Sequence, residues 1–224
     1  MTAARPLPEG SPMAAGPGPA PEVLLADVTL REHGQNLTTE QLARLPPALV
    51  LEVASLLAEA GIRRLEIFSC VSPRMAPAMS RERLRAITQG LGARPEVTFV
   101  TLVPTRSRFE SFLELGLGPE GLGHHAGLFF SAVEEHNRAN LGRGVEESLE
   151  ECRLLAAKAR ERGVPLVAYL SAAFGFVTPG GGLIEAPVER VLALVRSLRA
   201  LGASTVTLSD LQGVRSPEET GELL

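Results

Sequence analysis

The chain has 224 residues, with 22 basic and 26 acidic side chains, a formal net charge of −4 and 45% hydrophobic residues. This balanced charge, without a basic stripe or a block of like charge, argues against a nucleic-acid or membrane-surface partner, and the hydrophobic content excludes a disordered chain. The longest apolar runs are far shorter than the roughly 20 residues of a membrane-spanning helix, so we expect no membrane partner. Two cysteines are too few for a disulfide framework and favour a cytoplasmic location.

The first 21 residues differ in composition from the rest of the chain. They are dominated by Pro, Ala, Gly and Ser. A signal peptide needs an apolar core and a transit peptide needs an Arg-rich amphipathic helix, and this segment has neither. We therefore expect a disordered tail over residues 1–21 and a single folded domain over residues 22–224.

After the tail, short β-rich runs alternate with longer helical patterns, which predicts a parallel sheet covered by helices. Gly61, Gly163 and Gly202 follow helical patterns directly and are expected to be left-handed C-cap residues. The predicted strands are short apolar runs, typical of strands buried on both faces: Val23–Leu30, Arg64–Phe68, Val97–Val103, Gly127–Ser131, Pro165–Ser171 and Thr205–Ser209. The predicted helices are Pro47–Ala60, Ser80–Gly90, Ser107–Leu115, Val145–Arg162 and Pro187–Leu201.

The number of repeats separates a barrel from an open sheet. Successive predicted strands start about 36 residues apart, so eight units would need roughly 290 residues. About 203 residues follow the tail, and the sequence stops within what looks like the opening of a helix. No G-x-G-x-x-G follows the first strand, which disfavours a Rossmann fold. The predicted fold class is α/β: a TIM (β/α)8 barrel that is incomplete here, with about six units and strands seven and eight missing.

Several polar residues lie at the predicted strand ends. In β/α barrels the reacting groups lie at the C-terminal ends of the strands. Carboxylates from several strand ends, together with an Arg, are typical of a site for a hard divalent cation such as Mg²⁺ or Mn²⁺. The candidates are Asp27, Arg31, Glu32, Glu66, Ser69, Glu134, Glu135, His136, Asn137, Asn140, Tyr169, Ser171 and Asp210.

Each candidate also has an ordinary structural interpretation. Asp27 and Glu66 lie in apolar strands, where a charge must be paired or ligated. They could pair with Arg31 or Arg64 inside the barrel without taking part in chemistry. The other ordinary interpretations are a solvated loop for residues 134–136, a plain loop for His124–His125, and buried packing for Cys70 and Cys152.

Four segments resemble a known family when they are taken together. Residues 27–36, DVTLREHGQN, resemble the first-strand motif of the DRE-TIM metallolyases. Residues 65–79 and 134–150 resemble the second strand and the loop after strand four of hydroxymethylglutaryl-CoA lyases, and residues 207–219 are similar to their strand six. The Val-Ser-Pro and His-Asn-x-x-Asn loops favour this lyase branch over the related acyl-CoA condensing synthases. The resemblance runs from about residue 23 to the end.

The resemblance implies a metal-dependent retro-Claisen cleavage of 3-hydroxy-3-methylglutaryl-CoA to acetyl-CoA and acetoacetate. The implied cofactor is a divalent metal, Mg²⁺ or Mn²⁺, and the implied partner is a small acyl-CoA substrate. The implied roles are enolate stabilisation by Arg31, metal binding by Glu32, orientation of Arg31 or the metal shell by Glu66, a place near the proton-transfer path for Asp210, substrate binding by Gln35 and Ser171, and pocket or loop packing by Asn137 or Asn140.

The chain departs from the family pattern at Glu32, where the family has Asp, and at His33, where it has Gly. Strand six lacks the family's Thr after Asp210. The family's His-x-His metal pair and catalytic Cys loop belong to strands seven and eight. Three functions stay open: a hydroxymethylglutaryl-CoA lyase-like enzyme, a divergent lyase or aldolase for another 3-hydroxy acyl substrate, and a non-catalytic barrel remnant. Because strands one and six would be open edges, we expect a homodimer.

Overall fold

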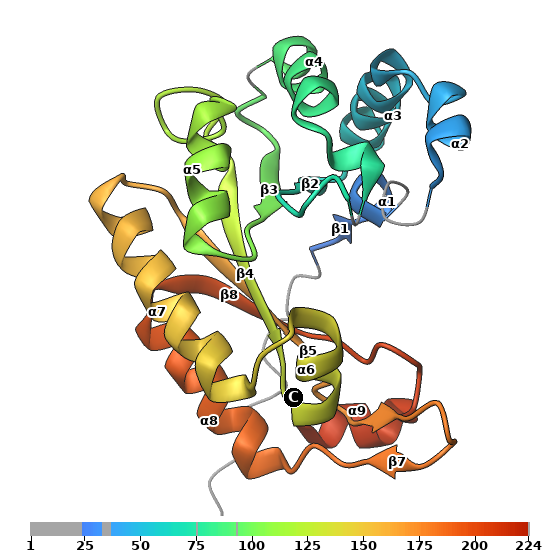
Figure 1. Cartoon of the computed structure of the whole chain (residues 1–224), viewed down its shortest axis with the longest axis vertical. Helices are drawn as coiled ribbons and strands as arrows, with labels where there is room; N and C mark the ends of the chain where they lie inside the picture. The colour runs from blue at the N-terminus through green and yellow to red at the C-terminus, as the bar shows by residue number, and fades with distance from the viewer. Residues whose placement is uncertain (1–23, 33–36, 75, 93, 224) are drawn as a thin grey trace, which may run out of the picture.

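The computed structural model describes residues 24–32, 37–74, 76–92 and 94–223. The expected tail, Gln35 and His33 lie outside these residues. A six-stranded sheet in the order β1-β2-β3-β4-β5-β8 runs through the molecule, and all its strand pairs are parallel. It curls into part of a barrel (Figure 1), as predicted. The strands are β1 Ala26–Asp27, β2 Arg64–Ser69, β3 Thr98–Leu102, β4 His125–Ser131, β5 Leu166–Ser171 and β8 Ala203–Leu208.

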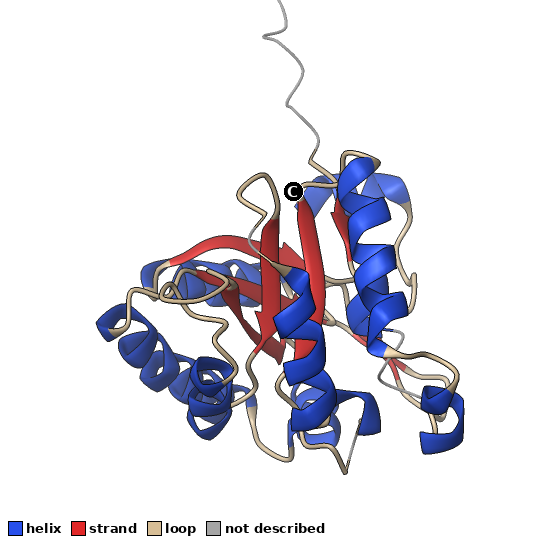
Figure 2. Ribbon diagram, turned by 90° about the horizontal axis from the view of Figure 1, so that it is seen from above, coloured by secondary structure: helices blue, strands red, loops and turns tan. Residues whose placement is uncertain are grey.

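The helices lie around the outside of the curled sheet (Figure 2). All five predicted helices are confirmed, with ends shifted by a few residues. No helix in the described part of the chain is both long and apolar enough to cross a lipid bilayer. The helices are α1 Thr29–Glu32, α2 Thr39–Ala43, α3 Pro47–Glu59, α4 Arg81–Leu91, α5 Arg106–Glu114, α6 Glu134–Leu141, α7 Val145–Glu161, α8 Val188–Ala200 and α9 Pro217–Leu223, with a 3-10 turn, η1, at Pro77–Met79.

Three glycines end the long helices that precede strands. Gly61, Gly163 and Gly202 have φ angles of 93°, 64° and 100°. These left-handed conformations suit glycine because it has no Cβ to clash with the neighbouring carbonyl. The predicted C-caps are confirmed, and each one turns the chain from an outer helix into the next strand.

The main core lies between the sheet and its helices. Its largest fully buried side chains include Phe68, Phe109, Phe112 and Phe130. A second, smaller cluster of Val100, Leu102, Val167 and Tyr169 comes from β3 and β5. Because side chains alternate along a strand, this second cluster lies on the opposite, inner face of the sheet. Strands β2, β3, β4 and β5 are buried along most of their length, as the apolar runs predicted, but the edge strands β1 and β8 are largely exposed, so for these two the expected burial on both faces is wrong.

The first strand is much shorter than predicted. The expected strand was Val23–Leu30, but β1 covers only Ala26–Asp27 and the one-turn helix α1 follows it. The Asp27 carboxylate accepts hydrogen bonds from the Thr29 amide (2.9 Å) and from the Thr29 hydroxyl (3.1 Å). An Asp bonded in this way turns the backbone into a helix start. One expectation was that Asp27 pairs with Arg31 or Arg64. In the structure its carboxylate bonds to Thr29 instead.

A small hairpin was not predicted. It pairs β6 Phe176–Val177 with β7 Leu183–Ile184 in antiparallel fashion. Gln212 links it to the loop after β8, since its side chain accepts from the Val177 amide (2.7 Å) and donates to the Val177 carbonyl (3.0 Å). Two-residue strands give too little periodicity for a sequence pattern to reveal.

His124 and His125 were expected to lie in a plain loop. His124 does lie in the loop before β4, but its side chain is buried, and His125 is the first residue of β4. The His124 side chain is fully buried, with Nδ1 lying 3.0 Å from the Thr101 hydroxyl. Its ring packs on Phe99, with the two ring centroids 5.1 Å apart. Burial, with a smaller contribution from His125, lowers the pKa of His124 from its ordinary 6.5 to about 3. The ring is therefore neutral in the folded protein at physiological pH.

We expect this histidine to make the fold sensitive to acid. Between pH 6.5 and about 3 the unfolded chain binds a proton at His124 that the folded chain does not, so the free energy of unfolding falls as pH falls. From about pH 7.5 to pH 5 the loss from this one group is about 2 kcal/mol. Urea unfolding of the wild type and His124→Gln at both pH values measures it.

The wild type should lose more stability over this range than His124→Gln, by about that amount. His136→Gln is the matched control, because the pKa of His136 is also lowered by burial but its ring is only half-buried. His136→Gln should change the pH dependence of the free energy of unfolding less than His124→Gln does. Parallel pH dependences for the wild type and His124→Gln would contradict the prediction.

Candidate functional site

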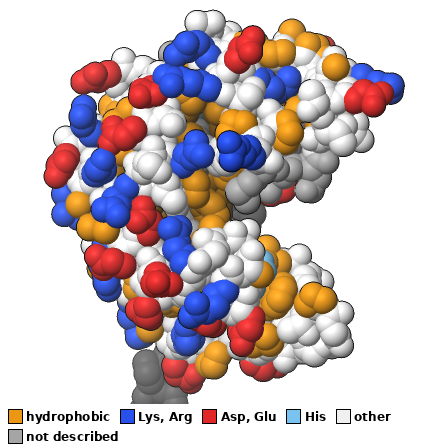
Figure 3. Space-filling view, in the orientation of Figure 1, with side chains coloured by type: hydrophobic (Ala, Val, Ile, Leu, Met, Phe, Trp, Pro, Cys, Tyr) orange, Lys and Arg blue, Asp and Glu red, His pale blue; other side chains and the backbone are white. Residues whose placement is uncertain are grey.

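A cavity of about 680 Å³ opens at the C-terminal ends of the strands. Ser69 of β2, Leu102 of β3, and Tyr169 and Ser171 of β5 line it. Figure 3 shows the hollow cut into one side of the molecule, with basic side chains along its upper wall. This is the end of a β/α barrel that carries the reacting groups, and the volume suits a small-molecule site.

Arg31 lies in the cavity wall between two carboxylates. Its Nε is 2.7 Å from Glu66 Oε2, and its Nη1 is 2.6 Å from Glu32 Oε1. The Arg31 side chain is 15% exposed, the Glu66 side chain 3% and the Glu32 side chain 51%. The turn of α1 brings Arg31 and Glu32 to the cavity, and β2 brings Glu66 beneath them. The structure thus joins three predicted site residues and shows that Glu66 pairs with Arg31.

A network that the sequence did not reveal continues from Glu66 into the barrel. The Tyr169 hydroxyl accepts from Arg64 Nη2 (3.2 Å) and lies near enough to Glu66 for the two groups to interact, while Arg64 Nη1 donates to the Thr205 hydroxyl (3.0 Å). Burial, and then the charge of Glu66, raise the pKa of the Tyr169 phenol well above its ordinary value. The one feature of the sequence that could have indicated this network was the position of Arg64 at the start of an apolar strand. Because Arg64 holds the buried Tyr169 side chain in place, Tyr169 in turn limits the positions open to the Glu66 carboxylate.

Gly127 leaves space for the Tyr169 ring. A Cβ added at Gly127 would lie 2.7 Å from Leu102 Cδ2 and 3.1 Å from Tyr169 Cε2. The first distance is too short for real atoms, so any larger residue would displace these neighbours. Glycine in the interior of a strand commonly marks such a close approach.

Ser171 lines the cavity at the end of β5. Its carbonyl accepts a hydrogen bond from the Ser131 hydroxyl (3.2 Å). The next residue, Ala172, is fully buried and has a φ of 50°, which is unfavourable for a residue with a Cβ. Such strain is often found at binding sites. Substrate binding by Ser171 stays a prediction, as does the same role for Gln35, which lies outside the described residues.

Asp210 organises the loop that follows β8. Its Oδ1 accepts from the Val214 amide (3.0 Å) and its Oδ2 from the Arg215 amide (3.1 Å). Partial burial raises the pKa of Asp210, but these backbone bonds outweigh it and hold the pKa below its ordinary value. The cavity is lined by its neighbours Ser209 and Leu211. The ionised carboxylate therefore shapes the rim, and its predicted place near a proton-transfer path stays a prediction.

Residues 134–136 were expected to form a solvated loop, but they are the first turn of α6. Three residues of this helix point to different surroundings. Asn137 is fully buried and binds the turn between α6 and α7, while His136 and Asn140 line the cavity. The His136 ring also packs against Phe176, with centroids 4.7 Å apart. The sequence of this short polar helix resembles a loop, because the groups that bind its one buried side chain, Asn137, lie outside the helix.

Both cysteines are buried and free, as predicted. Burial raises the pKa of Cys70 and of Cys152 to about 12. Both thiols are therefore protonated at neutral pH, and a protonated thiol is a poor nucleophile. Neither cysteine supplies a catalytic thiolate here.

The described residues do not by themselves fit a divalent cation. Among those that line the cavity, Glu32 is the one acidic side chain, and it is paired with Arg31. No group of three or more His, Cys, Asp or Glu side chains in the described ranges could hold a metal ion. A hard cation needs several oxygen ligands. Metal binding by Glu32 stays a prediction.

Sequence comparison finds acyl-CoA lyases among the proteins similar to this chain. A hydroxymethylglutaryl-CoA lyase of Bacillus subtilis is 30% identical over 168 residues, which are 75% of this chain and 52% of that protein. An (R)-citramalyl-CoA lyase of Chloroflexus aurantiacus is 31% identical over 209 residues, covering 90% of this chain and 62% of its own length. No family model matches the chain. The chain spans about half the length of most of the curated relatives it matches.

Solved structures agree with the sequence comparison. The hydroxymethylglutaryl-CoA lyase of Pseudomonas aeruginosa superimposes with a TM-score of 0.76 at 27% identity, covering 90% of this chain and 62% of that one. The Bacillus subtilis enzyme gives 0.76 at 26% identity, with 92% and 64% covered. The curled sheet therefore matches part of a TIM barrel, which confirms the predicted fold class.

Proposed function

The chain is a hydroxymethylglutaryl-CoA lyase-like member of the DRE-TIM metallolyases, and from this premise we propose that it acts as a carbon–carbon lyase on a 3-hydroxy acyl-CoA. The proposed substrate is 3-hydroxy-3-methylglutaryl-CoA and the proposed products are acetyl-CoA and acetoacetate. One observation carries the proposal: the Arg31 guanidinium lies in the cavity wall, held between Glu66 at 2.7 Å and Glu32 at 2.6 Å.

The proposed role of Arg31 is electrostatic. In a retro-Claisen cleavage the C3 hydroxyl loses its proton, C3 becomes the ketone carbon of acetoacetate, and the C2–C3 electron pair moves onto C2. The resulting enolate carries charge on the thioester oxygen and takes up a proton at C2 to give acetyl-CoA. A guanidinium that is already oriented stabilises this charge without reorganising, and such a group contributes about 3 kcal/mol or more to the transition state. Glu66 and Tyr169 hold the guanidinium in place. We assign the proton transfer to none of the described residues.

The proposal includes a divalent cation, Mg²⁺ or Mn²⁺, which when bound would supply Lewis-acid stabilisation of substrate oxygens. Glu32 would contribute one carboxylate. Because the described residues do not complete a cation site, no step above depends on the metal. A homodimer and a cytoplasmic location also stay predictions, the second supported by the two free cysteines.

A second candidate is a lyase for another 3-hydroxy acyl-CoA. The similarity to a protein named (R)-citramalyl-CoA lyase favours it, since that similarity covers 90% of this chain. Glu32 favours it too, because its side chain is one methylene longer than the Asp that the family has at this position.

The test measures binding and turnover separately. Calorimetry measures the affinity for 3-hydroxy-3-methylglutaryl-CoA and citramalyl-CoA, and an acetyl-CoA assay measures cleavage with added Mg²⁺, with Mn²⁺ and with a chelator. We expect Arg31→Lys to cut turnover about 100-fold or more, since a Lys cannot bond Glu66 and the substrate in the same geometry. Binding without cleavage would instead support a non-catalytic barrel remnant, and the absence of both would overturn the proposal.

A further inference from the structure

The cavity carries more positive than negative charge. Among the described residues, Arg31, Arg108 and Arg143 line it together with one carboxylate, that of Glu32. Glu32 and Glu66 already neutralise Arg31. Within the described ranges, neither Arg108 nor Arg143 has a carboxylate within 4.0 Å of its guanidinium. Within the described residues, two arginines of the cavity wall therefore lie outside any close ion pair, although the charge of Arg143 also acts on Glu151 at longer range.

Arg143 is held firmly by neutral groups. Its Nη2 donates to the Pro104 carbonyl (2.9 Å) and its Nε to the Ser148 hydroxyl (3.2 Å). These bonds fix the side chain through neutral groups, and the nearby Glu151 carboxylate interacts with its charge without forming a close ion pair. The same bonds also tie the α6–α7 turn to the loop that precedes α5, so both arginines are attached to the same part of the rim.

Arg108 is the freer of the two. Its backbone is fixed in the first turn of α5, where the Thr105 hydroxyl caps its amide (3.4 Å), and its side chain is half-buried. No hydrogen bond of its guanidinium is found among the described residues. Arg108 lines the cavity together with Ser69 and Val71 at the end of β2. Its charge acts on the buried Cys70 thiol between these two residues.

We infer that Arg108 is an oxyanion-binding residue that anchors the anionic end of the bound acyl-CoA, with the fixed Arg143 beside it. The planar guanidinium binds a carboxylate or a phosphate through two parallel hydrogen bonds. A partly desolvated guanidinium without a counter-ion gains from such a partner. This inference rests on the proposed function for the identity of the ligand, which offers both kinds of oxyanion: the acyl carboxylate and the CoA phosphates.

Calorimetry with three probes tests the inference on the full chain. The probes are free 3-hydroxy-3-methylglutarate, which carries the carboxylates alone, CoA, which carries the phosphates alone, and 3-hydroxy-3-methylglutaryl-CoA. We expect Arg108→Gln to weaken binding of the acyl-CoA by about 10- to 100-fold, and Arg108→Lys to recover part of the loss. A parallel loss for the free acid identifies the carboxylate as the anchor, and a parallel loss for CoA identifies the phosphates.

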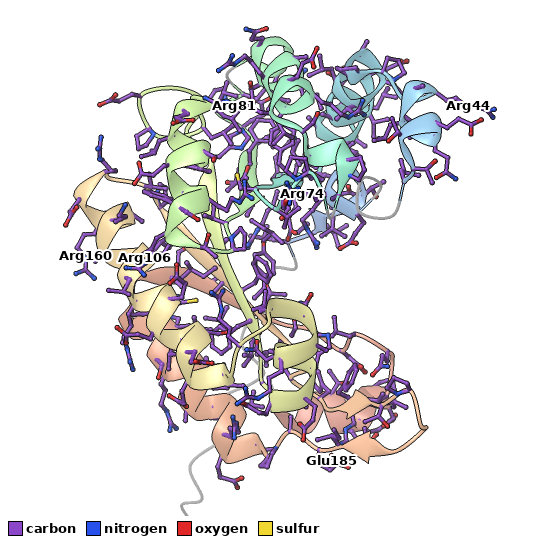
Figure 4. The ribbon with its side chains drawn as sticks, viewed as in Figure 1. Arg44, Arg74, Arg81, Arg106, Arg160 and Glu185 are labelled. Carbon is purple, nitrogen blue, oxygen red and sulfur yellow. The ribbon has the colours of Figure 1, made fainter. Side chains whose placement is uncertain are left out.

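Arg160→Gln is the matched control. It removes one Arg charge from α7 on the outer side of the molecule, away from the cavity (Figure 4), and should leave all three affinities unchanged. Equal urea midpoints for the variants and the wild type exclude a folding effect. Unchanged affinity of Arg108→Gln for every probe would overturn the inference. Binding that depends on Arg108 without any cleavage would overturn the proposed lyase function alone, so the two failures are distinguishable.

Discussion

Replacement of Arg31 by methionine is expected to lower the free energy of unfolding by about 3–5 kcal/mol. Methionine fills much of the same space but leaves the Glu66 carboxylate, whose side chain is 3% exposed, without its cationic partner. A buried charge that has lost its partner is costly because water cannot replace the lost interaction. Urea unfolding followed by far-ultraviolet circular dichroism measures the change; the chain has no Trp to report by fluorescence.

Two further variants make this result specific. Glu66→Gln in the Arg31→Met background should recover a large part of the lost stability, because a neutral amide is less costly to bury than an unpaired carboxylate. Arg153→Met is the surface control. Its partner Glu150 is 3.0 Å away and both side chains are about half exposed, so the loss should stay below about 1 kcal/mol. If the two cavity substitutions simply added, the buried pair would not be coupled.

Asn137→Ala is expected to lower the free energy of unfolding by about 3 kcal/mol, since each buried polar group left unpaired costs about 1–3 kcal/mol. Asn137 Oδ1 accepts from the Ser131 amide (2.8 Å), and Nδ2 donates to the Arg143 carbonyl (2.9 Å) and the Ser148 hydroxyl (2.8 Å). Alanine leaves all three groups without this partner. Urea unfolding gives the loss, and hydrogen exchange should show faster opening of the α6–α7 turn.

Asn140→Ala is the control on the same helix. Asn140 is exposed at the cavity, one turn from Asn137, and its loss should change stability by less than about 0.5 kcal/mol. If the two substitutions lowered the free energy of unfolding equally, any alanine in α6 would be destabilising. That result would contradict the specific role of Asn137. Because Asn137 binds the Arg143 carbonyl, the same variant should also loosen the guanidinium beside Arg108.

The candidate site was predictable where its residues follow strands directly. Arg31, Glu32 and Glu66 come after or within apolar strands, and strand ends meet at one rim of a parallel barrel. Arg108 and Arg64 gave no such signal. Arg108 is one of several charges in an amphipathic helix, and nothing local distinguishes it from Arg106, which pairs with Glu151 on the surface. Its place in the cavity wall depends on where the curled sheet and the packing of α5 against α7 put the first turn of α5.

The sequence by itself determined the features that depend on neighbouring residues. The alternation of apolar runs and amphipathic segments specified a parallel sheet covered by helices, and Gly61, Gly163 and Gly202 specified where helices end, because only glycine adopts the left-handed conformation without steric cost.

The tertiary structure decided which polar and charged side chains contact one another. Glu66 pairs with Arg31 and reaches Arg64 only through Tyr169, His124 is buried beside Thr101, and Asn137 binds groups up to eleven residues away. These choices depend on the desolvation and geometry of groups from separate strands and helices, which come together only when the sheet curls. The local sequence pattern does not specify which groups of separate strands and helices come close together. The polar contacts inside the barrel are therefore determined by the tertiary structure.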